Sequence, residues 1–101
     1  MPDQSFSIDS DDSRGLSIAG DVDEPHAAAL RDAIEHRSAG YTTGLVVDLT
    51  AVTYLPSVAV GVIATARQKL QAAGTTLDLV AGDGSIAQRV LSVCALPFRT
   101  A

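Results

Sequence analysis

The sequence predicts an α/β fold, with a mixed sheet of four to five strands and three to four helices packed mainly on one face. Two observations predict this fold. Strand-like and helix-like segments follow one another in the order β, β, α, β, α, β, α, which indicates parallel strands joined by right-handed helical crossovers. The segment Leu45–Leu49 is almost continuously apolar, and such a run is typical of a strand buried on both of its faces.

The first two strands are predicted to form a hairpin. Polar and apolar residues alternate in Ser5–Ile8 and again in Gly15–Ala19, as they do in strands with one buried face. The segment between them contains Asp11–Ser13, which is rich in turn formers. We therefore expect the two strands to pair antiparallel.

The first helix follows this hairpin. Asp23 or Glu24 stands before Pro25, and proline is favoured at the first helical position. Apolar residues recur at helical spacing up to about Arg37, and Gly40 is expected to end the helix. The apolar stripe consists of Ala27, Leu30, Ala33 and Ile34.

The second helix is predicted from about Val58 to Ala73, and Gly74 ends it. A strand is predicted to follow over Thr76–Val80. The core stripe of this helix is expected to consist of Ala59, Val62, Ile63, Ala66, Leu70 and Ala73.

The third helix is predicted to begin after the turn Gly82–Ser85, with Ser85 as its N-cap. Its apolar residues are Ile86, Val90 and Leu91, and it is expected to end near Cys94. Pro97 then starts a short tail.

Composition and charge narrow the function classes. The 101 residues, 47% of them hydrophobic and 19% charged, suit one globular domain over residues 1–101. The net charge is −5, and no cluster of Lys and Arg provides a footprint for nucleic acid. With no Trp, two Phe and two Tyr, the chain also offers few platforms on which nucleobases stack.

A cytoplasmic location is expected by elimination. The single cysteine, Cys94, cannot form an internal disulfide and is expected to be a small core residue. The start of the chain does not combine basic residues with an apolar stretch, as a secretion signal does. The longest apolar run, near Val58, is too short to span a bilayer, so no membrane association is expected.

A family resemblance rests on several segments in a fixed order. The segment Val46–Gly61 resembles the core of STAS domains, in which a buried strand ending in Asp or Asn precedes a helix that opens with the motif D-S-S-G-L-G. Asp48 matches the acidic position, and Ser57 and Gly61 match the helix motif. Ala19–Asp23 is similar to the turn T-G-E-L-D of the family, and Ala72–Leu77 resembles its A-x-G-x-x-L joint.

The resemblance extends to Val90–Val93, which resembles the last helix of the family. It therefore implies a STAS-like fold over nearly the whole chain. Anti-sigma factor antagonists of this family are not enzymes. They bind an anti-sigma factor that is a serine kinase with a histidine-kinase-like ATPase fold, and this binding frees the sigma factor. The kinase phosphorylates the first serine of the helix motif, which corresponds to Ser57 here.

The chain departs from the family motif at Pro56, where the family usually carries Asp. Proline removes both a carboxylate and a backbone N–H group. Three alternatives follow: Ser57 is phosphorylated despite Pro56, the chain binds its partner constitutively, or some other input controls binding. Val58 and Ala59 also replace the usual Ser or Thr and Gly.

Ser57 precedes the apolar helix pattern and is predicted to be an N-cap. Leu55, Val58 and Val60 either form an exposed apolar patch beside Ser57 or are buried under the sheet. The predicted partner-binding residues are Asp21, Asp23, Glu24, Leu55, Pro56, Ser57, Val58, Val60 and Gly61. The oligomeric state stays open between a monomer and a weak dimer.

Other polar residues favour no catalytic, metal or cofactor site. The carboxylates of Asp21–Glu24 do not follow a calcium-loop pattern. His26 and His36 lie ten residues apart on one predicted helix and do not share a face as i, i+4 zinc ligands do. Asp48 at a strand end is either catalytic or a hydrogen-bond acceptor for the following loop, which we prefer. The turn at 82–85 lacks the lysine and glycine spacing of phosphate-binding loops.

Two further functions stay open. STAS domains also serve as accessory subunits of lipid-transport ABC complexes and as sensor modules that hold a small ligand. A small α/β enzyme that uses Asp48 is the least favoured alternative, because no partner base or nucleophile accompanies this residue in the sequence.

Overall fold

A computed structural model describes residues 6–10 and 15–100 of the chain. Five strands form one sheet in the spatial order β1-β2-β3-β4-β5, in which only the β1–β2 pair is antiparallel. The strands are β1 (Ser7–Ser10), β2 (Gly15–Asp21), β3 (Leu45–Tyr54), β4 (Leu77–Ala81) and β5 (Arg99–Thr100). The helices are α1 (Glu24–Arg37), α2 (Ser57–Ala72) and α3 (Ile86–Val93). The predicted mixed α/β fold is therefore confirmed.

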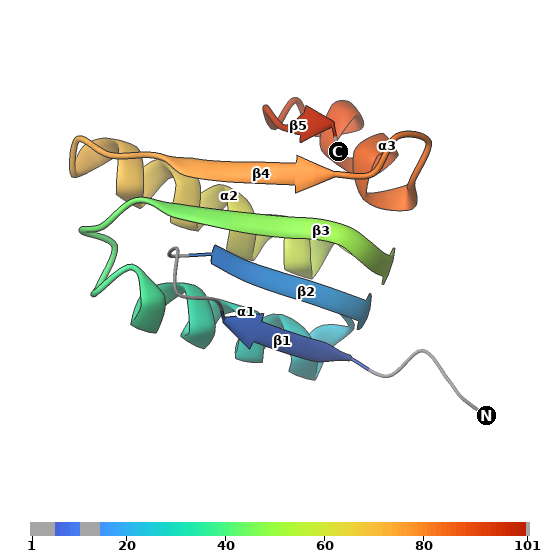
Figure 1. The fold of residues 1–101 in the computed structure, drawn as a ribbon, viewed down its shortest axis with the longest axis horizontal. Coiled ribbons are helices and arrows are strands. Elements are labelled where there is room, and N and C mark those ends of the chain that lie inside the picture. The colour runs from blue at the N-terminus through green and yellow to red at the C-terminus, as the bar shows by residue number, and fades with distance from the viewer. Residues whose placement is uncertain (1–5, 11–14, 101) are drawn as a thin grey trace.

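The helices α1 and α2 lie side by side behind the sheet, and α3 follows the carboxyl end of β4 (Figure 1). The β1–β2 pairing confirms the predicted hairpin, although Ser5 and Asp11–Ser13 lie outside the described residues. The core between the sheet and the helices is aliphatic. Its largest fully buried hydrophobic side chains are Leu16, Ile18, Leu30, Ile34, Leu49, Ile63, Leu70, Leu79, Leu91, Val22 and Val47.

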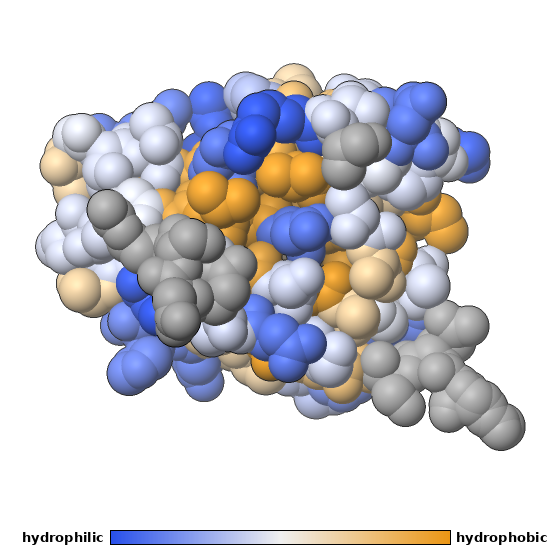
Figure 2. Space-filling view, in the orientation of Figure 1, coloured by the Kyte–Doolittle hydropathy of each residue, from blue (hydrophilic) through white to orange (hydrophobic). Residues whose placement is uncertain are grey.

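The sheet is buried on one face only, so the prediction that Leu45–Leu49 is buried on both faces is wrong. Leu45, Val47 and Leu49 are buried, while Val46 and Asp48 between them are partly exposed. Since successive side chains of a strand point to opposite faces, the helices cover one face and leave the other open. Figure 2 shows this open face, where an apolar area surrounds a small polar patch.

The third strand is longer than predicted and continues to Tyr54. Its pairing with β2 includes Ala19↔Ala51, Gly20↔Val52 and Asp21↔Tyr54, with two register shifts, at each of which β3 has one residue more than β2. These irregularities break the alternation of buried and exposed side chains, so the second half of β3 lacks the two-residue period by which strands are predicted.

The short strand β5 was not predicted, because its two residues are too few to show the alternation of polar and apolar side chains that is typical of a strand. Arg99 pairs with Val80 of β4 in the sheet register, and its guanidinium Nη2 lies 2.7 Å from Oδ2 of Asp78. This ion pair, together with two residues of parallel pairing, holds β5 against β4.

The helix boundaries lie within one or two residues of the predicted ones. Asp23 is the N-cap of α1 and Ser85 that of α3, as predicted. After α1 the chain passes through three residues with positive φ, of which Gly40 (φ 72°) is the middle one. Cys94, the C-cap of α3, is exposed. The prediction of a core cysteine is wrong, because α3 turns only Ala87 and Leu91 fully inward.

Candidate functional site

The candidate site lies where β2 and β3 end next to each other. Both strands are parallel, so their carboxyl ends meet at the same edge of the sheet (Figure 1). The backbone N–H of Val22 donates to the carbonyl oxygen of Tyr54 at 3.0 Å. The turn that starts α1 therefore lies beside the loop that starts α2, and Tyr54, which is 50% exposed, stands between them.

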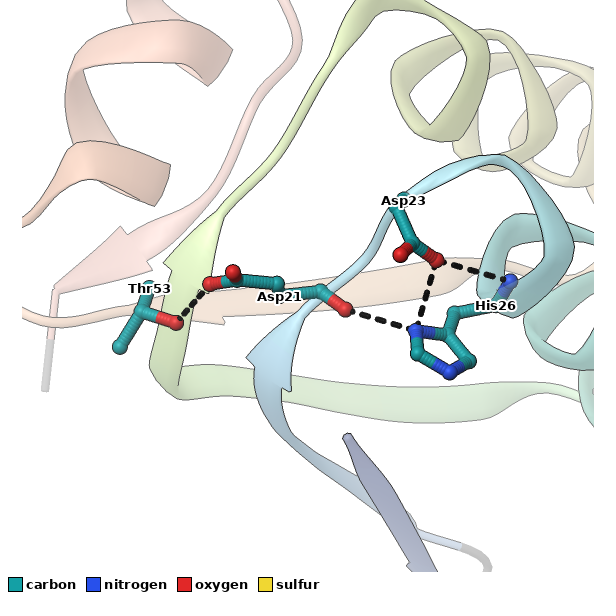
Figure 3. A network of polar contacts seen from close by, with 4 residues as sticks. All are labelled: Asp21, Asp23, His26 and Thr53. Atoms are coloured by element: carbon teal, nitrogen blue, oxygen red, sulfur yellow. Dashed lines mark hydrogen bonds and ion pairs between the residues drawn. The ribbon is translucent and has the colours of Figure 1, made fainter. Parts of the chain in front are cut away.

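A hydrogen bond joins these two strand ends through their side chains. The hydroxyl of Thr53 donates to Oδ1 of Asp21 at 2.5 Å (Figure 3). The two residues are 32 positions apart, so their contact was not predictable without the strand register. It fixes the carboxylate of Asp21, one of the predicted partner-binding residues, at the edge of the site.

His26 ties the turn to the first helix. Its Nδ1 lies 3.0 Å from the carbonyl oxygen of Asp21 and 2.7 Å from Oδ1 of Asp23, as Figure 3 shows. Both partners are hydrogen-bond acceptors, so Nδ1 carries the proton. The imidazole also stacks on Phe6, with 4.2 Å between ring centroids. The sequence indicated His26 only as a candidate metal ligand, because no local pattern reveals this structural role.

The second helix begins at Ser57, and its N-cap is Pro56, which makes no side-chain cap hydrogen bond. The prediction that Ser57 is the N-cap is therefore wrong by one position. The carbonyl oxygen of Pro56 accepts from the N–H groups of Ala59 and Val60 at 3.0 and 3.1 Å. Ser57 itself is exposed, and its hydroxyl makes no hydrogen bond with the rest of the described chain.

The apolar residues around Ser57 divide into buried and exposed. Leu55 and Val60 are 3% and 9% exposed and belong to the core. An exposed patch of three residues is thus contradicted, and the burial alternative holds for these two. Val58 is 43% exposed, so it alone presents an apolar side chain beside Ser57.

A groove runs along α2 from this point. Its volume is about 330 Å³, and we call it the α1–α2 groove; its lining residues are Arg31, Tyr41, Val58, Gly61, Val62, Thr65 and Lys69. The ammonium of Lys69 lies 4.8 Å from the centroid of the Tyr41 ring, within the range of a cation–π interaction. Desolvation, with a smaller contribution from the carboxylate of Glu35, raises the pKa of the Tyr41 phenol.

Asp48 is not part of this site. It lies within β3, six residues before the strand ends at Tyr54, which is about 20 Å along the strand. The prediction that it stands at a strand end is therefore wrong. Its Oδ1 accepts a hydrogen bond from the N–H of Thr50 at 2.9 Å, the acceptor role that we preferred.

The remaining polar clusters offer no second site. Among residues 6–10 and 15–100, no group of three His, Cys, Asp or Glu side chains is placed to hold a metal ion. In the turn before α3, the N–H of Gly84 donates to Oε1 of Gln88 at 2.6 Å. The hydroxyl of Ser85 accepts from the N–H of Gln88 at 3.0 Å. These polar groups of the turn thus form hydrogen bonds that cap α3.

A one-sided mixed sheet whose second crossover helix opens with an exposed serine is the architecture of a STAS domain. A family model described as "Mlab, STAS domain" matches residues 6–94. The chain belongs to this family of STAS domains.

Particular relatives are anti-sigma factor antagonists. Over 82 residues the chain is 37% identical to the anti-sigma-F factor antagonist RsfB of Mycobacterium tuberculosis H37Rv, covering 80% of the chain. The match spans 65% of that relative, slightly less than two thirds of its length. The structure is also similar to an anti-sigma factor antagonist from Mycobacterium paratuberculosis, with a TM-score of 0.74 and 27% identity over 94% of this chain and 84% of that one.

The unphosphorylated form of the anti-sigma factor antagonist SpoIIAA has the same fold, with a TM-score of 0.74. Its identity to this chain is 17%, over 96% of this chain and 88% of that one. Within the described residues, every helix is too short or too polar to cross a bilayer.

Proposed function

We propose that this protein is an anti-sigma factor antagonist: a non-enzymatic, cytoplasmic STAS domain over residues 1–101 that binds an anti-sigma factor and thereby frees a sigma factor. The observation that carries the proposal is the surface at the start of α2. There, exposed Ser57 and Val58 stand at the end of the sheet, beside a turn that hydrogen bonds hold in place. The identity to RsfB supports the same function.

The proposed binding surface consists of Asp21, Asp23, Glu24, Pro56, Ser57, Val58 and Gly61. These residues are exposed or partly exposed. Leu55 and Val60 support this surface from the core and do not themselves contact the partner. The exposed apolar area of this surface is small, which fits a contact that forms and dissociates, since large apolar interfaces are typical of permanent complexes.

Phosphorylation of Ser57 is the proposed control of binding. The first N–H groups of an α-helix have no acceptor within the helix, and the positive end of the helix dipole favours an anion. The first turn of α2 contains no acidic residue. A phosphate would add about −1.5 to −2 charges next to Val58, and this charge must be desolvated or repelled when a partner docks.

The proposed partner is an anti-sigma factor with the fold of a histidine-kinase-like ATPase and serine-kinase activity, as the resemblance implies. Pro56 bears on this proposal, because it removes the carboxylate that the family places next to the accepting hydroxyl. Partner binding does not require that carboxylate, whereas transfer of phosphate to Ser57 is the step that its loss weakens.

The test is to incubate the chain with Mg-ATP and each anti-sigma kinase of the host, and then to measure intact mass and map peptides. We expect one phosphate on Ser57, absent in Ser57→Ala and retained in the matched control Ser92→Ala, an exposed helical serine on α3. Complex formation without phosphate identifies a constitutive antagonist. If the chain neither gains a phosphate nor forms a complex with any of these kinases, the proposal is contradicted.

A second candidate function is an accessory or sensor role. The matching family model carries the name Mlab, so this domain is not confined to proteins named as anti-sigma factor antagonists. Co-purification with a transporter ATPase in place of an anti-sigma factor would favour this candidate.

A further inference from the structure

The α1–α2 groove is continuous with the proposed binding surface. Four of its lining residues, Val58, Val62, Thr65 and Lys69, follow one another on α2 at spacings of four, three and four. Residues at these spacings share one face of a helix, so the groove runs along α2 for about 16 Å. It begins at Val58, the residue directly after Ser57.

A missing side chain leaves part of the groove empty. Gly61 lies in the middle of the stripe, and a Cβ added to it would meet no heavy atom within 4 Å. Its φ is not in the left-handed region, so the backbone does not require glycine there. The space over Gly61 is therefore open to a side chain from another molecule.

Two basic side chains line the groove, although the chain has a net charge of −5. Arg31 and Lys69 are its charged lining residues, and both are exposed. Arg31 has a loose contact with Asp32, 3.6 Å between Nη2 and Oδ1, and Lys69 lies over the neutral ring of Tyr41. The carboxylates of Asp32 and Glu35 belong to α1, and neither is among the described residues that line the groove.

We infer that this groove receives a segment of the anti-sigma factor that combines an aliphatic side chain with a carboxylate. This inference rests on the function proposed above. The aliphatic side chain packs on Val58, Gly61 and Val62, and the carboxylate pairs with Lys69 or Arg31. A cavity of about 330 Å³ is small by the standard of ligand pockets and suits one or two side chains of a protein partner.

The same arrangement gives phosphorylation a direct way to act. A phosphate on Ser57 lies at the mouth of the groove, next to Val58. It adds negative charge where an acidic segment approaches, and like charges in an interface oppose docking. Binding then fails without any change in the fold of the domain.

The test measures, by isothermal titration calorimetry, the affinity of chain variants for the host anti-sigma factor that binds the wild-type chain most tightly. Gly61→Leu fills the groove and is expected to weaken binding by about tenfold or more. Lys69→Glu reverses a charge at the rim and is expected to weaken binding by about three- to tenfold, with a reduced salt dependence. The matched control Arg89→Glu makes the same charge change on α3, outside the groove, and should stay within about twofold of wild type.

The melting temperature of each variant separates binding from folding. Gly61→Leu should melt no lower than the wild type, because leucine favours a helix more than glycine does. If it does melt lower, the affinity of Thr65→Gln for the anti-sigma factor is measured in its place. This variant puts a longer, helix-favouring side chain in the groove. Sedimentation of the chain alone tests whether a second copy occupies the groove.

The outcomes distinguish the two claims. If the wild-type chain binds the anti-sigma factor and both Gly61→Leu and Lys69→Glu bind it with the same affinity, this inference is overturned and the proposed function stands. A wild-type chain that binds no anti-sigma factor of the host overturns both. A change in self-association of the chain alone on substitution of Gly61 assigns the groove to a second copy and also overturns the inference.

Discussion

At the scale of single residues, Pro56 sets the geometry at the start of α2. It is the N-cap of α2, with φ −76° and ψ 172°, and it offers no side-chain acceptor to the first turn. Its φ is close to the value that the proline ring imposes, so the residue is unstrained. The helix therefore begins with a rigid backbone and without a side-chain cap.

Exchange of Pro56 tests this account of the helix start. Pro56→Asp adds a cap acceptor, worth about 1 kcal/mol, and loses about 0.4–1 kcal/mol of proline rigidity. Pro56→Ala loses the rigidity and gains nothing. We expect the free energy of unfolding, measured with urea, to be about 1 kcal/mol higher for the Asp variant than for the Ala variant. Equal stability of the two variants would contradict a missing cap.

Tyr41 provides a prediction about pH. Desolvation raises the pKa of its phenol above the ordinary value of 10.0. Above about pH 10 the unfolded chain thus releases this proton before the folded chain does, so the free energy of unfolding falls as pH rises. The decline should be smaller in Tyr41→Phe, while the two proteins should behave alike below about pH 9. Urea unfolding across this range measures the difference. If the free energy of unfolding has the same dependence on pH in both proteins, the prediction is wrong.

At the scale of elements, α2 has two different faces. Ile63 and Leu70 are fully buried against the sheet, while Val58, Gly61 and Thr65 line the α1–α2 groove. The buried face contributes stability and the other face is available to a partner. Substitutions on the two faces should therefore have opposite consequences.

We expect Gly61→Ala to raise the free energy of unfolding by about 0.5–1 kcal/mol, because alanine favours a helix and its Cβ enters open space. Ile63→Ala should lower it by about 2–4 kcal/mol, since it leaves a cavity in the core. Urea unfolding of both variants provides the comparison. Destabilisation by Gly61→Ala would mean that the space over Gly61 is not open.

Sequence patterns predicted the helices well and the ends of the strands less well. Helix α2 was placed within one residue at each end, because its apolar stripe and Gly74 are local signals. The predicted stripe included Val62 and left out Val60, which is wrong, because Val60 is buried and Val62 is partly exposed. Each residue of a helix is rotated by about 100° from the one before it, so Val60 and Val62 lie on opposite sides of the buried row. The position of the sheet determines that Val60 is the buried one.

The contacts that form the candidate site could not be predicted from the sequence, because they too depend on how distant segments pack together. Ser57 was identified from its family motif, but the bond from Thr53 to Asp21 and the position of His26 depend on the register of β2 against β3. The α1–α2 groove depends on how two helices pack side by side. Such long-range geometry is absent from local periodicity.

At the scale of the whole molecule, one set of contacts joins the sheet to the starts of both crossover helices. The edge at which β2 and β3 end is linked by the bonds of Val22 to Tyr54 and of Thr53 to Asp21. His26 connects the same edge to α1. A phosphate on Ser57 should therefore change the charge of this edge without moving its elements.

The most direct test of the central claim is to measure release of sigma factor. A preformed complex of a host anti-sigma factor with its sigma factor is titrated with the wild-type chain, with Ser57→Asp and with Ser92→Asp, and free sigma factor is followed by native mass spectrometry. We predict that the wild-type chain and Ser92→Asp release the sigma factor, and that Ser57→Asp releases it only weakly. A wild-type chain that leaves every such complex of the host intact would contradict the account.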